Sequence, residues 1–109
     1  MHAHVFTAEA LAALAHKHKK YAPQLVVESG KHVILTGDRS SGPIPFMSGF
    51  SDVEGRLTAM DASGVDVQIV SVTPGNFCYD APLDSGLAIA AAQNDAIAEM
   101  VDNHPDRFV

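Results

Sequence analysis

The amino terminus reads MHAHVF and contains two histidines, His2 and His4, separated by one residue. If residues 1–6 form a strand, side chains at i and i+2 lie on one face, ~7 Å apart, and two imidazoles can hold one metal ion. On a helix the same spacing turns the side chains about 200° apart, so no chelate forms. His16 and His18 repeat the spacing in a helical stretch, and we expect no metal there. The metal hypothesis therefore depends on an extended amino terminus.

Neutral imidazole is a common zinc ligand, and a catalytic zinc site uses about three protein ligands and a water. His2 and His4 supply only part of such a site. A bare HxH also arises by chance in a chain with six histidines. The single cysteine, Cys78, excludes an internal disulfide. Without a sign of a lowered pKa, we expect Cys78 to pack rather than to react.

Composition narrows the class of protein. The chain has 109 residues, 47% of them hydrophobic, and a net charge of −6 with only 7 lysines and arginines. An acidic chain without a basic stripe argues against nucleic-acid binding. No apolar run of about 18 residues and no signal peptide are present, so we expect no membrane association and a cytoplasmic location.

Periodicity and turn residues predict an α/β fold with short connections. After the first strand we expect a helix over Ala8–Lys20 capped by Thr7, a hairpin over Gln24–Thr36 turning at Ser29–Lys31, and a loop over Gly37–Gly49. A capping box at Ser51 and Glu54 predicts a helix that ends at Gly64, followed by a strand over Val65–Val72 buried on both faces. A loop over Thr73–Pro82, a helix from Leu83 that stops before His104, and a strand start at Arg107–Val109 complete the order. The last helix is expected to show one face formed by Leu83, Leu87, Ala90, Asn94, Ile97 and Val101.

Strand, helix, strand, helix, strand is the order of a parallel sheet, and two such units with a hairpin insert match the opening of a (β/α)8 TIM barrel. We therefore treat residues 1–109 as the N-terminal fragment of one barrel domain, truncated after about two βα units. In a barrel the carboxyl ends of the strands form the catalytic face. That places His2 and His4 beside Ser71, Thr73 and the loop 74–82, whereas His104 falls on the opposite face.

Four blocks in the sequence carry a family resemblance. They are MHAHVF, the junction Arg56–Val65, the segment SVTPGNFCY at Ser71–Tyr79, and NDAIA at Asn94–Ala98 followed by PDRF at Pro105–Phe108. Together they resemble the first third of the amidohydrolase-related metal-dependent decarboxylases. The resemblance implies a TIM barrel with zinc or a similar divalent ion, in which His2 and His4 are two of the ligands. The other ligands and the catalytic histidine of that family come from later strands.

The resemblance also implies a function and a set of binding residues. The expected activity is decarboxylation, a carbon–carbon lyase reaction, of a small unsaturated or aromatic carboxylic acid, with Lys31, Phe77 and Tyr79 as substrate-binding residues. From the residues alone, Phe77 and Tyr79 suit pocket lining and plain packing equally well. Gly30–Lys31 matches the family, but an arginine expected shortly afterwards is replaced near Ile34.

Other interpretations stay open. A hydrolase or hydratase of the same superfamily would share the metal site. A non-catalytic α/β module that self-associates is a third hypothesis, and in either case exposed sheet edges predict a homo-oligomer. The 109 residues alone are expected to be inactive. Arg56 and Asp61 are expected to pin their helix through polar pairs, and Asn94 and Asp95 to fix helix contacts.

Overall fold

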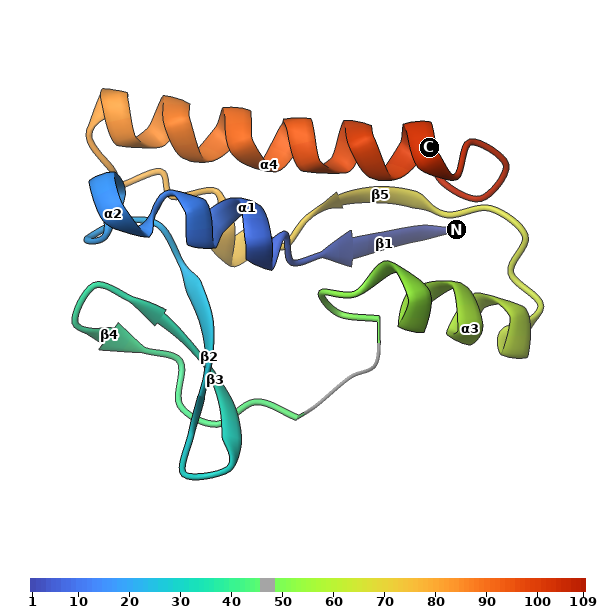
Figure 1. The fold of residues 1–109 in the computed structure, drawn as a ribbon, viewed down its shortest axis with the longest axis horizontal. Helices are drawn as coiled ribbons and strands as arrows, with labels where there is room; N and C mark the ends of the chain where they lie inside the picture. The colour runs from blue at the N-terminus through green and yellow to red at the C-terminus, as the bar shows by residue number, and fades with distance from the viewer. Residues whose placement is uncertain (46–48) are drawn as a thin grey trace.

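The computed structural model describes residues 1–45 and 49–109, which form a mixed α/β structure with two sheets. A parallel pair joins β1 (His2–Val5) to β5 (Ile69–Val72), and an antiparallel sheet joins β2 (Gln24–Glu28), β3 (Lys31–Thr36) and β4 (Arg39–Ser40). Figure 1 shows the β2–β3 hairpin extending away from the parallel pair. The predicted α/β class, the first strand and the hairpin with its turn at Ser29–Gly30 are confirmed.

A third parallel segment begins beside β5, as predicted for the end of the chain. The Val70 amide donates to the carbonyl of Val109 at 2.9 Å, and Gln68 and Phe108 form a parallel bridge. The expected strand over Val65–Val72 is shorter than predicted and starts at Ile69. Val65, the first residue of the predicted strand, instead belongs to the turn that ends the preceding helix, because its amide donates to the carbonyl of Met60.

One face of the parallel pair is buried and the other is open. Val5 and Val70 lie under α3 (Val53–Ser63) and α4 (Leu83–Asn103), where Val70 packs with Met60, Met100 and Phe108. On the other face His2 and His4 are exposed, and Ile69 is 53% exposed. Burial of the second strand on both faces was therefore a wrong prediction for this chain, because nothing among the described residues covers its second face.

The predicted helix over Ala8–Lys20 is broken into α1 (Ala8–Ala13) and α2 (Ala15–His18). At the break the Leu14 amide donates to the carbonyl of Leu11, a tighter i→i−3 bond than that of an α-helix. Residues on both sides of this tight turn make tertiary contacts, which helix propensity does not reveal. Leu11 packs in a core with Phe6, Ala22 and Ile89, and the buried His18 contacts Ser85 at 2.9 Å. The predicted side-chain cap by Thr7 is absent.

The amino end of α3 is capped by Asp52 and not by the predicted box of Ser51 and Glu54. The two Asp52 carboxylate oxygens accept from the amides of Gly49 and Gly55, each at 2.8 Å. One carboxylate oxygen thus caps the helix while the other fastens the preceding loop. The predicted end at Gly64 is confirmed by its φ of 73°.

Both predicted loops contain short regular elements. Residues 37–49 include β4, which pairs with β3, and residues 73–82 include the 3-10 turn η1 (Pro74–Asn76). Residues 46–48 of the first loop lie outside the described part of the chain.

The helix α4 ends before His104 as predicted, but only part of the predicted face turns to the core: Ile97 and Val101 pack against the cluster of Met60, Val70, Met100 and Phe108. Leu83 and Leu87 are 78% and 62% exposed, while the buried positions are Ser85, Ile89, Gln93 and Met100. Two of these buried residues are polar, so a pattern based on apolar residues did not include them. Asn94 and Asp95 lie on the exposed side, so the expectation that they fix helix contacts was wrong. Within the described ranges, no helix combines the length and the apolar character needed to span a bilayer.

A glycine at position 49 is required by close packing. Gly49 has a φ of 88°, and an added Cβ would lie 2.7 Å from Cα of Arg56. We expect Gly49→Ala to lower the free energy of unfolding by about 2 kcal/mol or more, because both the backbone conformation and the contact are unfavourable. Gly86→Ala is the matched control, since that helical position has open space and alanine should raise stability by about 0.5–1 kcal/mol. Urea unfolding measures both, and equal effects of the two variants would contradict the packing.

Candidate functional site

The two amino-terminal histidines lie together on the open face of β1. Their ring centroids are 4.9 Å apart, with the rings edge to face. Parallel pairing sets His2 opposite Ile69 and His4 opposite Ser71. The predicted strand and the shared face of the two imidazoles are therefore confirmed.

Ser71 lies between the two rings, beside the histidines as predicted. Its Oγ is 2.9 Å from Nε2 of His2 and 3.0 Å from Nδ1 of His4. Nδ1 of His4 also lies 3.2 Å from the carbonyl oxygen of Val72, which can only accept a hydrogen bond. In a neutral His4 ring this contact favours the tautomer with the proton on Nδ1, which leaves the lone pair on Nε2. A backbone carbonyl that fixes the tautomer in this way is typical of a metal-ligating histidine.

The donor set available in this chain is incomplete. No group of three or more His, Cys, Asp or Glu side chains that could hold a metal ion occurs within residues 1–45 and 49–109. Two imidazoles fit half of a tetrahedral zinc sphere. His16 and His18 do not add to it, because they lie in α2 and His18 is buried against Ser85.

A buried arginine holds the histidine strand in place. Arg56 of α3 is only 8% exposed, and its Nη2 donates to the carbonyl of His4 at 2.8 Å while Nη1 donates to Oε1 of Gln68 at 3.1 Å. Its Nε has no partner. Burial lowers the pKa of Arg56, and the charge of Asp52 opposes that shift. The expectation that Arg56 and Asp61 pin their helix is confirmed, since Asp61 pairs with Arg107 at 2.8 Å.

The expected substrate-binding residues do not all lie in one place. Phe77 and Tyr79 follow the carboxyl end of β5, with ring centroids 5.5 Å apart, and both line a cavity of about 400 Å³. Lys31 pairs with Glu28 at the turn of the hairpin that extends away from the parallel pair (Figure 1). The structure therefore does not bring Lys31 to the histidines. His104 packs against Phe108 before the third parallel segment, on the side predicted for it.

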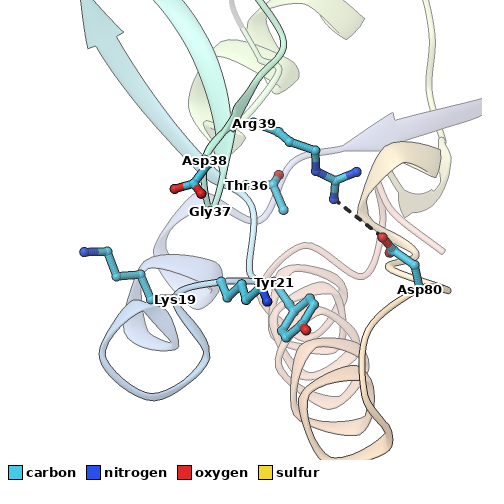
Figure 2. A pocket seen from close by; sticks show the side chains of 8 residues that line it. Lys19, Tyr21, Thr36, Gly37, Asp38, Arg39 and Asp80 are labelled. Atoms are coloured by element: carbon cyan, nitrogen blue, oxygen red, sulfur yellow. Dashed lines mark ion pairs between the residues drawn. The ribbon is translucent and has the colours of Figure 1, made fainter.

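A larger cleft adjoins the cavity of Phe77 and Tyr79. It measures about 550 Å³ and is lined by Lys19, Lys20, Tyr21, Thr36, Gly37, Asp38, Arg39 and Asp80 (Figure 2). Sequence reasoning missed this cleft, because its basic residues come from segments that are far apart in the chain. The basic run at residues 16–20, which supplies Lys19 and Lys20, was a local signal for an anionic partner.

Comparison with known proteins finds a partial likeness. No family model matches the sequence. A stretch of 58 residues, 53% of this chain, is 34% identical to 2-amino-3-carboxymuconate-6-semialdehyde decarboxylase from Dictyostelium discoideum. The match covers 16% of the length of that relative. It supports a distant relationship to a decarboxylase of the amidohydrolase family.

Removal of the Arg56 guanidinium should weaken the attachment of β1 to α3. We expect Arg56→Gln to reduce the free energy of unfolding by about 3 kcal/mol, because the partly buried His4 carbonyl and the buried Gln68 side chain lose a charged donor. Asp61→Asn is the control, since it breaks an ion pair whose carboxylate is 68% exposed and should cost less than about 1 kcal/mol. Denaturant unfolding compares them, and an Arg56→Gln variant as stable as Asp61→Asn would contradict the anchoring.

Cys78 should be a slow nucleophile. Burial raises the pKa of its thiol, and the Asp80 carboxylate raises it further. Because only the thiolate reacts, alkylation by iodoacetamide at pH 8 should be slower than that of free cysteine. The rate should increase in Asp80→Asn, which lowers the pKa, and stay unchanged in Asp84→Asn. Alkylation of the native chain as fast as free cysteine would contradict the assignment.

Proposed function

We propose that this chain supplies the first strands and two metal ligands of an amidohydrolase-type decarboxylase. The observation that carries the proposal is the pair His2 and His4, held on one face of a parallel strand with Ser71 between them. The partial likeness to a decarboxylase points to the same chemistry.

The arrangement of the parallel strands supports a barrel. β1, β5 and the segment at Phe108 run parallel, and the helices α3 and α4 cover one face. In a (β/α)8 barrel the helices form the outer ring and the opposite face of each strand points inward. The open face carrying His2, His4 and Ile69 would be that interior, closed by strands outside residues 1–109.

The proposed cofactor is a divalent ion, with zinc as the expected metal. In the tautomer with the proton on Nδ1, Nε2 of His4 has a lone pair for the ion, whereas Nε2 of His2 must exchange its contact with Ser71 for the ion. A bound ion would polarise a substrate oxygen and lower the pKa of a bound water. The remaining ligands and the proton-transfer groups would come from later strands. The substrate would be a small unsaturated or aromatic carboxylic acid, with Phe77 and Tyr79 near the carboxyl end of β5 as lining residues.

Two alternatives have specific support. A hydrolase or hydratase of the same superfamily would use the same pair of histidines. A self-associating module would use the uncovered face of the parallel pair, where Ile69 is 53% exposed. For the self-associating module, a homo-oligomer would cover the open edge of β1.

Metal binding by the apo chain tests the proposed site. Titration with Zn²⁺, followed by NMR at pH 7.5, should shift the ring signals of His2 and His4 before those of the other histidines. His2→Ala and His4→Ala should each weaken binding at least tenfold, because one imidazole cannot chelate. His16→Ala is the matched control and should leave binding unchanged. Equal losses in all three variants, or first binding elsewhere, would refute the site.

The reaction itself is tested on the longer protein that contains these strands. With 2-amino-3-carboxymuconate-6-semialdehyde as the probe substrate, the proposal predicts release of carbon dioxide that depends on His2 and His4. Hydrolysed or hydrated product without carbon dioxide would favour the alternative enzyme class.

A further inference from the structure

The cleft of Lys20, Arg39 and Tyr21 and the cavity of Phe77 and Tyr79 share part of their lining. Tyr21, Thr36, Arg39 and Asp80 line both. The two spaces therefore adjoin, with lysines at one end and two aromatic rings at the other. Neither space is lined by His2 or His4, so a ligand could bind there without a metal.

The walls of this hollow are fixed by contacts between distant segments. Gly37, in the turn between β3 and β4, lies so close to the segment before β2 that an added Cβ would be 2.8 Å from the carbonyl oxygen of Lys20. The Cys78 thiol lies 3.6 Å from the carbonyl oxygen of Tyr21, which ties the loop after β5 to the same place. Residues about 60 positions apart thus form one preformed hollow.

The Arg39 guanidinium in the hollow is available to bind a ligand. Arg39 reaches across to Asp80 (Figure 2), but the closest approach is 3.6 Å, and both side chains are about 70% exposed. An exposed ion pair of this kind contributes little stability. The Arg39 side chain donates no hydrogen bond within the described ranges, so its donors are free to form the paired bonds that guanidinium makes with a carboxylate. Asp38 points to the opposite side from Arg39 (Figure 2).

The hollow also offers aromatic surface next to its cations. Lys20 Nζ lies 5.6 Å from the centre of the Tyr21 ring. Phe77 and Tyr79 are 44% and 89% exposed, and their rings contact each other. A planar apolar group can stack on such rings while its acid group faces the guanidinium.

We propose that this hollow binds a small aromatic carboxylate; the choice of ligand class rests on the proposed function, whereas binding in the hollow involves neither His2 nor His4. The carboxylate displaces Asp80 and takes paired hydrogen bonds from Arg39, with Lys20 as the neighbouring cation. The ring of the ligand lies toward Phe77 and Tyr79. Because the charged side chains stay largely exposed, we expect a dissociation constant on the order of 1 mM.

A titration of the metal-free chain with three probes tests this site. Benzoate carries both the ring and the charge, benzamide only the ring, and inorganic phosphate only the charge. ¹H–¹⁵N NMR should show saturable shifts at Arg39, Tyr21 and Phe77 with benzoate, and at least tenfold weaker binding of the other two. Benzamide or phosphate binding as tightly as benzoate would overturn the proposal.

Three substitutions should change the affinity for benzoate in three different ways. Arg39→Gln should weaken benzoate binding about tenfold, as expected for the loss of a charged pair of hydrogen bonds. Asp80→Asn should strengthen binding several-fold, because it removes the carboxylate that competes for Arg39. Lys17→Gln removes the same charge from the exposed face of α2 outside the hollow and should change nothing. The site is wrong if Arg39→Gln behaves like Lys17→Gln, or if Asp80→Asn weakens binding in a chain whose spectrum is otherwise native.

Discussion

The buried guanidinium of Arg56 is the contact on which the placement of β1 against α3 depends. It crosses from α3 to the carbonyl of His4 and to the side chain of Gln68, so one residue joins the helix to the strand that carries the histidines and to the residue before β5. Burying an arginine without a bonded carboxylate has a cost, which the lowered pKa reflects. Those polar contacts offset part of that cost, because they give hydrogen-bond partners to the buried guanidinium and to the buried side-chain oxygen of Gln68.

Several features that look unrelated depend on this contact. The loop before α3 must approach the Arg56 backbone closely, which requires a glycine at position 49. Asp52 fastens that loop by accepting from the Gly49 amide, and its charge lies close enough to act on the pKa of Arg56. The next residue of the loop, Phe50, accepts a hydrogen bond from the Phe6 amide just after β1. Helix start, loop and strand end are thus held as one unit, with the imidazoles on the face that α3 and α4 leave free.

The sequence predicted the elements whose signal is local. Alternation in MHAHVF is enough to place His2 and His4 on one face, and the Ser29–Gly30 turn is enough to define the hairpin. Local signals failed where long-range polar contacts decide the outcome. Ser85 and Gln93 form the buried face of α4 because they bond to His18 and to the carbonyl of Asn76, partners that no periodicity reveals. The placement of Lys31 failed for a related reason, since family likeness cannot show where this hairpin points.

The central claim is that β1 and β5 pair in parallel with His4 opposite Ser71, so that the two imidazoles share one hydroxyl. A nuclear Overhauser measurement on the metal-free chain tests it most directly. The account predicts cross-peaks between the ring protons of His2 and His4, and from both rings to the β-protons of Ser71. Rings that show no contact with each other, or a register in which His4 faces a different residue of β5, would contradict it.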